Sequence, residues 1–124
     1  MSKTLGTTHI APEVLVTIAQ LTALSVPGVD RLSHSFTSRL NRLLGKRSTH
    51  HGVEVYVEGD AVSVDLHIVV EQGVNIVQVS EKVQAEISRA VNEMVGMTVR
   101  EVNVYIQDVN LSKAQPTTDE GAAG

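Results

Sequence analysis

The amino-acid sequence predicts an α+β fold in which two helices pack on one face of a small, mostly antiparallel sheet of three or four strands. Three patterns predict this fold: two amphipathic helical segments, a hairpin of alternating apolar residues, and a final alternating strand. Their order along the chain is (β)-α-β-β-α-β. Two helices that each carry one apolar stripe cover one face of such a sheet and leave the other face open.

The first helix is expected to follow a short leading strand at residues 7–10. Pro12 suits the first position of this helix, where its missing N–H costs no hydrogen bond. Pro27 cannot continue the helical hydrogen-bond ladder, so the helix ends in the segment before it. The face expected to be buried is spaced at i, i+3, i+4 and i+7 and consists of Leu15, Ile18, Ala19 and Thr22.

A β-hairpin is the clearest pattern in the chain. Residues 53–58 and 61–70 alternate between two sets of side chains on either side of Gly59-Asp60, which supplies a tight turn. The alternation fixes the strand register, because a shift by one residue would turn the acidic set toward the core. The inward set is Val53, Val55, Val57, Val62, Val64, Leu66, Ile68 and Val70.

A second helix and a last strand follow the hairpin. Asn75 is placed to cap this helix, with Gln78 three residues further on, and Gly96 ends it. The apolar stripe of the helix is Ile76, Val79, Val83, Ile87, Ala90, Val91 and Met94. In the last strand, Val102, Val104 and Ile106 are expected to point inward, and Asn103, Tyr105 and Gln107 outward.

Length and composition limit the class of protein. The chain has 124 residues, for which we expect a flexible stretch at 1–7, one domain over 8–111 and a disordered tail at 112–124. The absence of cysteine excludes disulfides and thiolate zinc sites, and it fits a reducing, cytoplasmic compartment. No segment has the roughly 20 apolar residues of a membrane-spanning helix, and the N-terminus lacks the apolar core of a signal peptide. Any membrane contact is therefore expected through the surface or through a partner.

Charge is spread unevenly along the sequence. The segment from residue 30 to residue 52 carries a net charge of +4, whereas the whole chain carries −4 and the remainder therefore −8. Within this basic loop, a short amphipathic helix is predicted near residues 37–44. The basic side chains either bind an anionic surface or keep an exposed loop soluble, and the sequence leaves both open. They are Arg31, Arg39, Arg42, Lys46 and Arg47.

No catalytic, metal or cofactor site is predicted. Ser63, Asp65 and His67 are the residue types of a hydrolase triad, but they project from one strand roughly 6.5–7 Å apart, beyond hydrogen-bond reach. His50-His51 lacks the additional ligands of a zinc site. The run from Gly45 to Ser48 lacks the spacing of a phosphate loop. No GxxG run lies within residues 8–111, so the RNA clamp of a KH module is missing from the predicted domain.

The open face of the sheet is the second candidate surface. Tyrosines are favoured at protein interfaces because they bury a large area at low entropic cost, although single exposed apolar residues are also common on ordinary surfaces. The outward residues proposed for this interface are Tyr56, Val69, Asn103 and Tyr105.

Several runs of the sequence resemble the alkaline shock protein family of bacterial envelope stress response proteins. They are residues 10–14 (IAPEV), 26–29 (VPGV), 52–55 (GVEV), 64–76 (VDLHIVVEQGVNI) and 102–109 (VNVYIQDV). Ala11 departs from the family's usual serine, which removes a side-chain helix cap worth about 1 kcal/mol. The resemblance covers about residues 8–111.

The resemblance implies a non-enzymatic cytoplasmic protein of cell-envelope homeostasis. Family members include proteins that lie beneath the membrane through a membrane-anchored partner, proteins that self-associate, and some that are connected to fatty-acid synthesis. The hypothesis is therefore a scaffold or adaptor that binds a membrane-anchored protein, copies of itself, or both. The alternatives are a regulatory subunit of a soluble enzyme and, disfavoured by the acidic remainder of the chain, a nucleic-acid-binding module.

Overall fold

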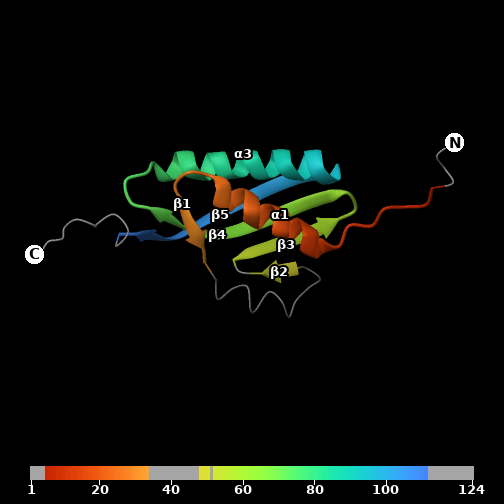
Figure 1. Ribbon diagram of the computed structural model, residues 1–124, viewed down its shortest axis with the longest axis horizontal. Coiled ribbons are helices and arrows are strands. Elements are labelled where there is room, and N and C mark those ends of the chain that lie inside the picture. The colour runs from red at the N-terminus through yellow and green to blue at the C-terminus, as the bar shows by residue number, and fades with distance from the viewer. Residues whose placement is uncertain (1–4, 34–47, 51, 112–124) are drawn as a thin grey trace, which may run out of the picture.

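The computed structural model describes residues 5–33, 48–50 and 52–111, and it has the α+β architecture that the sequence predicts (Figure 1). The predicted helix near residues 37–44 lies outside the described residues. The helices are α1 (Pro12–Ser25) and α3 (Ile76–Val95). The strands are β1 (Val29–Leu32), β2 (Ser48–His50), β3 (Val53–Glu58), β4 (Ala61–Glu71) and β5 (Thr98–Asn110).

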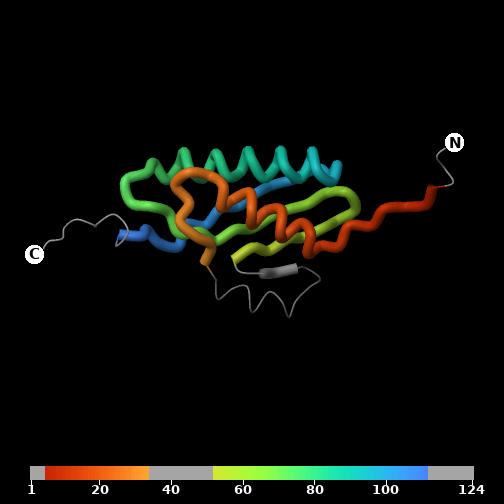
Figure 2. The backbone as a smooth tube through the Cα atoms, viewed as in Figure 1, coloured from red at the N-terminus to blue at the C-terminus, as the bar shows by residue number. Residues whose placement is uncertain are grey.

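Strand β4 is the centre of the sheet. It pairs in parallel with β5 along one edge, and α3 connects these two strands as a crossover (Figure 2). The other edge of β4 is shared: β3 pairs with residues 61–66 and β1 with residues 68–70, both antiparallel. The short strand β2 then pairs with β3. Three of the four pairings are antiparallel, as expected, but the described sheet has five strands instead of three or four.

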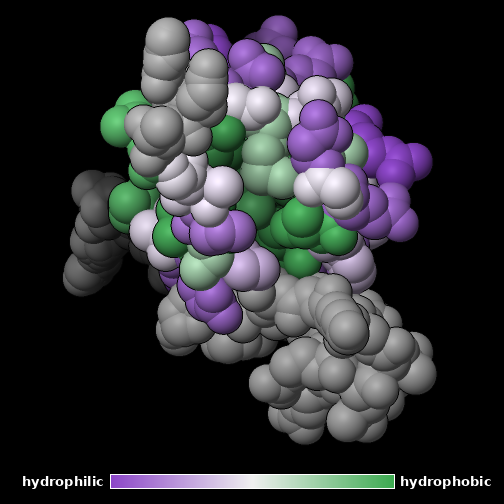
Figure 3. Space-filling view, turned by 90° about the vertical axis from the view of Figure 1, so that its right-hand side faces the viewer, coloured by the Kyte–Doolittle hydropathy of each residue, from purple (hydrophilic) through white to green (hydrophobic). Residues whose placement is uncertain are grey.

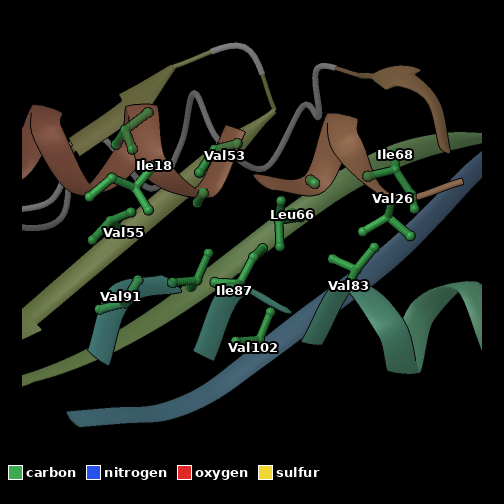
Figure 4. Close-up of a cluster of buried hydrophobic side chains, with 14 of the residues drawn as sticks. Ile18, Val26, Val53, Val55, Leu66, Ile68, Val83, Ile87, Val91 and Val102 are labelled. Atoms are coloured by element: carbon green, nitrogen blue, oxygen red, sulfur yellow. The ribbon is translucent and has the colours of Figure 1, made fainter. Parts of the chain in front are cut away.

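Both helices lie on the same face of the sheet and run in opposite directions (Figure 1). The core is formed by aliphatic side chains from both helices and from β3, β4 and β5, which point toward one another in Figure 4. Ile87 and Val83 of α3 and Leu66 of β4 are fully buried in it. Burying a side chain of this size stabilises the fold by roughly 1.5–3 kcal/mol, so this layer dominates the stability.

The ends of the helices follow the sequence prediction. Asn75 caps α3 by accepting a hydrogen bond from the Gln78 backbone N–H at 3.0 Å, and Gly96 ends the helix with a φ of +72°. Ala11 at the start of α1 has no side-chain cap. Helix α1 therefore depends on its buried face for stability, since a side chain that could cap it is missing.

Two predictions about strands were wrong. Residues 7–10 are exposed and form no strand, because a run of four residues without a neighbouring strand has nothing to satisfy its backbone groups. Conversely, β1 and β2 lie within the stretch predicted as irregular loop. Both strands are short and lack a period-two pattern, and their pairing with β4 and β3 supplies the order that local sequence does not.

The strands β1 and β3 meet at one residue of β4. The His67 N–H donates to the Gly52 carbonyl at 2.9 Å, and the His67 carbonyl accepts from the Ser33 N–H at 2.7 Å. Gly52 has a φ of +84°, and a Cβ placed on it would lie 2.2 Å from the Ser33 carbonyl oxygen. Glycine is therefore required here both by the backbone angle and by the close approach of another chain segment.

One end of the molecule exposes apolar side chains. Figure 3 views the end at which the β3–β4 turn and the C-terminus of α3 lie, and it shows apolar residues gathered in the middle of a polar rim. Val57 and Met94 are partly exposed here. Both were predicted to point inward, but the helices and strands end at this position and leave no neighbour to cover them.

Candidate interaction surface

The face of the sheet opposite the helices carries most of the outward residues that the sequence analysis selected. The register places Asp65 beside Asn103, and the Asn103 amide donates to the Asp65 carboxylate at 2.9 Å. It likewise places His67 beside Tyr105, whose rings stack with centroids 4.9 Å apart. Tyr56 projects from the neighbouring strand β3. This face, which we call the open face, therefore holds polar and aromatic groups on three paired and rigid strands.

Two ionisable residues of the open face are buried. Glu54 is 1% exposed and His67 is 5% exposed, although the alternation of the hairpin predicts both to face solvent. The Tyr56 hydroxyl donates to one carboxylate oxygen of Glu54 at 3.1 Å. Within the described residues, the other Glu54 oxygen and the His67 Nδ1 have no hydrogen-bond partner. Such groups are uncommon in proteins because leaving them unpaired costs about 1–3 kcal/mol each.

Burial sets the protonation of His67. It lowers the pKa of the imidazole below the ordinary value of 6.5, and the neighbouring carboxylates of Glu54 and Asp65 oppose this shift by favouring the charged ring. The imidazole is therefore neutral at pH 7. The Asp65 carboxylate accepts from the Asn103 amide, and the His67 Nδ1 has no hydrogen-bond partner among the described residues. The Asp–His hydrogen bond of a hydrolase triad is therefore not formed at Nδ1.

A hollow of about 730 Å³ lies on the accessible part of the open face. The ion pair between Arg100 and Glu58, at 2.5 Å, lies among its lining residues. Three of the lining side chains are acidic and one is basic, so the hollow favours cationic or polar groups over phosphate. The lining residues are Tyr56, Val57, Glu58, Ala61, Ser63, Asp65, Arg100, Glu101 and Asn103.

The four proposed open-face residues differ in exposure. Tyr105 is 45% exposed, and Tyr56 and Asn103 are half-buried, so all three can contact a partner. Val69 is only 3% exposed and contributes to packing. The accessible surface is therefore the half of the face nearer the β3–β4 turn, next to the hollow.

The basic set is described at one position only. Arg31 is exposed at the end of β1 and pairs with Asp30 at 2.6 Å. Arg39, Arg42, Lys46 and Arg47 lie outside the described residues, as do His51 and the greater part of the basic loop. Arg31 is thus partly neutralised by its own neighbour. The sheet register places it beside Val69 of the open-face set, and it does not line the hollow.

The buried pair Glu54 and His67 is the part of the surface that sequence reasoning missed. The pattern assigned both residues to the solvent side because they alternate with valine and leucine. The one available signal was the run of apolar residues at 68–70, in which alternation fails. Such a run indicates a strand buried on both faces.

Together, the fold and this surface define a class of protein: a small α+β protein with polar and aromatic side chains on the helix-free face of its sheet. Among the described residues, no group of three His, Asp or Glu side chains could hold a metal ion. The chain belongs to the alkaline shock protein 23 family, described as having a cell envelope-related function, whose model matches residues 1–111. This membership confirms the resemblance that the sequence motifs indicated.

Two proteins of Bacillus subtilis (strain 168) are similar to this chain. The uncharacterized protein YqhY is 33% identical over 112 residues, which cover 90% of this chain and 83% of YqhY. The uncharacterized protein YloU is 29% identical over 109 residues, covering 86% of this chain and 91% of YloU. These matches span nearly the whole length of each protein, so the family assignment applies to the chain as a whole.

Among solved structures, MamM-CTD 215-293 resembles this fold. The alignment has a TM-score of 0.49 at 15% identity and covers 79% of this chain and 99% of that chain. A likeness at this level supports no inference about function. Of the helices described here, none is both long and apolar enough to cross a membrane.

Proposed function

We propose that this protein is a non-enzymatic scaffold or adaptor of the bacterial cell envelope, which acts in the cytoplasm by binding a membrane-anchored protein and further copies of itself. One observation carries the proposal. The helix-free face of the sheet presents Tyr56, which lines a hollow, and the half-exposed Tyr105, which lies two residues along β5 from Asn103 of the same hollow. Both strands are held in place by their pairing with β4. Rigid tyrosines bordering a concave surface are a common arrangement for protein recognition.

The polar groups of this face support binding over catalysis. The Asp65 carboxylate and the Asn103 amide bond each other, and His67 is covered by its stack with Tyr105. These contacts commit the described polar groups to one another and to the packing of the sheet. A partner would instead contact the two tyrosines and the Asp65–Asn103 pair, which is held ready without further ordering.

A regulatory subunit of a soluble enzyme, for example in fatty-acid synthesis, remains the alternative that uses the same surface. A nucleic-acid-binding module fits less well. The hollow is lined by Glu58, Asp65 and Glu101 against Arg100 alone, and this excess of negative charge repels a phosphate backbone.

Native fractionation with cross-linking tests the proposal. We expect the wild-type chain to sediment with membranes and to cross-link to an integral membrane protein. Tyr56→Ala and Tyr105→Ala should each lower that recovery. Val77→Ala is the matched control, because Val77 is an exposed apolar residue on α3, away from the open face.

The identity of the captured protein decides between the alternatives. Recovery of one soluble metabolic enzyme in fixed stoichiometry would replace the adaptor by the regulatory subunit. Unchanged recovery of a membrane protein by both tyrosine variants, with native far-ultraviolet circular dichroism, would show that the open face is not the binding surface.

A further inference from the structure

The long edge of the sheet, formed by β5, is a second surface for binding, separate from the open face. Strand β5 has 13 residues, and within the described residues it pairs with β4 alone. The opposite edge of the described sheet is β2, with three residues. A long edge strand presents a row of backbone donors and acceptors that pairs readily with another strand.

The direction of the backbone groups on β5 follows from one hydrogen bond. The Gln84 side chain of α3 donates to the Val102 carbonyl at 3.0 Å, so this carbonyl points away from β4 and toward the edge. Alternate residues of a strand direct their N–H and C=O groups to the same side. Val104 and Ile106 therefore also present their backbone groups at the edge.

The regular part of this edge is bounded on both sides. The pairing of β5 with β4 skips Arg100 and Gln107, which are the extra residues of two bulges. Between them the strand runs without interruption from Glu101 to Ile106, with three edge-facing residues centred on Val104. A bulge disrupts the hydrogen-bond ladder locally, so we expect regular backbone pairing along the stretch between the two bulges, with the flanking side chains facing the partner strand at either end.

We propose that β5 pairs antiparallel with β5 of a second copy of this chain, about a two-fold axis at Val104. This proposal names the surface for the self-association that is part of the proposed function, and it rests on that function. In this register Val102 lies opposite Ile106 of the second copy, and Asn103 lies opposite Tyr105. The two sheets join into one, and both sets of helices lie on the same side.

Charge selects this register among its neighbours. With the axis at Val104, Arg100 lies opposite Asp108 of the second copy, and symmetry forms this pair twice. Both side chains are exposed. Moving the axis by one residue in either direction places Arg100 and Asp108 opposite uncharged residues. Opposite charges across antiparallel strands stabilise the pairing, and like charges weaken it.

The Gln84 side chain does not prevent this pairing. A carbonyl oxygen has two lone pairs, so the Val102 carbonyl can accept from Gln84 and from the Ile106 N–H of a second copy at the same time.

Charge exchange tests the proposal. Sedimentation velocity of the full chain at low salt should show a dimer that dissociates with rising salt. Arg100→Asp and Asp108→Arg should each raise the dimer Kd about tenfold, because each creates two like-charge pairs. The double variant R100D/D108R should restore the wild-type Kd. Glu58→Gln, which removes only the partner of Arg100 within one copy, should leave the dimer intact.

An introduced cysteine tests the register independently of charge. The chain has no cysteine, so Val104→Cys supplies a single thiol at the axis, where the two Cα atoms lie about 5.5 Å apart, within disulfide range. Oxidation should give a covalent dimer. Val102→Cys is the matched control, because its two copies would lie roughly 13 Å apart along the strands and should not cross-link.

The outcomes separate this inference from the proposed function. A chain that stays monomeric at all concentrations, or a dimer in which the double variant fails to rescue the single ones, would overturn the β5 pairing. Membrane recovery in the same preparations reports on the adaptor function alone. A monomer that still captures a membrane protein therefore rejects the inference and the self-association, and it retains the adaptor function.

Discussion

The imidazole of His67 lies against the phenol ring of Tyr105 from the adjacent strand, with ring planes inclined by only 16°. The stack joins the buried half of the open face to its accessible half, because His67 is covered and Tyr105 is half-exposed. A partner that contacts Tyr105 therefore acts directly on the ring that shields His67. The protonation of His67 therefore reports whether a partner has bound at Tyr105.

Removing the tyrosine ring should raise the pKa of His67. Burial is the main cause of the lowered pKa, and the carboxylates of Glu54 and Asp65 oppose it. Tyr105→Ala admits water to the imidazole, which weakens the desolvation and leaves the carboxylates to favour the charged ring. A titration followed by NMR of the His67 ring protons measures the shift. Tyr105→Phe keeps the stack and should keep the wild-type pKa.

Stability should depend on pH in the range just below the ordinary histidine pKa. Because the pKa of His67 is lower in the folded than in the unfolded chain, the unfolded chain binds more protons between the two values. The free energy of unfolding should therefore rise with pH through this window and be level with respect to His67 above 6.5. Urea unfolding at several pH values measures this slope.

A His67→Phe variant identifies the source of that slope. Phenylalanine retains a ring for the stack but does not titrate, so the slope between the folded-state pKa of His67 and pH 6.5 should disappear. The ion-paired Glu86 contributes in a different range: Arg89 lowers its pKa from 4.5, so its contribution is present above 4.5 and is lost as pH falls below that value. A slope that persists near pH 6 in His67→Phe would assign it to another group.

Gly52→Ala should be among the most destabilising single substitutions on the sheet. The added Cβ meets the Ser33 carbonyl oxygen at 2.2 Å, and the φ of +84° is unfavourable for alanine. We expect a loss of about 3 kcal/mol in the free energy of unfolding. Gly73→Ala separates the two causes, since Gly73 has a φ of +90° but open space around the position of a Cβ. Its loss should be about 1 kcal/mol.

The hydrogen bond between Asn103 and Asp65 should contribute about 1 kcal/mol to stability. A double-mutant cycle with Asp65→Ala and Asn103→Ala measures the coupling by thermal or urea unfolding. Coupling near zero would mean that the pair is held by its strands and contributes to binding alone.

Sequence patterns predicted the elements that are determined by residues near one another in the sequence. The hairpin and α3 follow directly from apolar spacing, and Asn75 and Gly96 mark the ends of the helix as their chemistry requires. The strands β1 and β2 could not be predicted in this way. Their residues have no alternation of their own, and they are strands because β4 and β3 offer free edges at those positions.

The candidate surface was predicted only in part, because the alternation along a strand shows which face a residue is on but not what covers that face. Alternation correctly assigned Tyr56, Asn103 and Tyr105 to the side away from the helices. It could not separate the exposed half of that side from the covered half, which holds Glu54 and His67. Whether an outward residue meets water depends on segments distant in sequence, and a period of two carries no information about them.

The meeting of β1 and β3 at His67 determines where the chain tolerates an insertion. Ser33 and Gly52 are bonded to the same residue, so the segment between them starts and ends at one point of β4. Strand β2 (Ser48–His50) lies within this segment and pairs with β3, so residues 34–47 connect two strands of one sheet. Each doubling of the length of such a connection costs about 0.6 kcal/mol in loop-closure entropy. A reporter or affinity tag inserted within residues 34–47 should therefore leave the sheet intact.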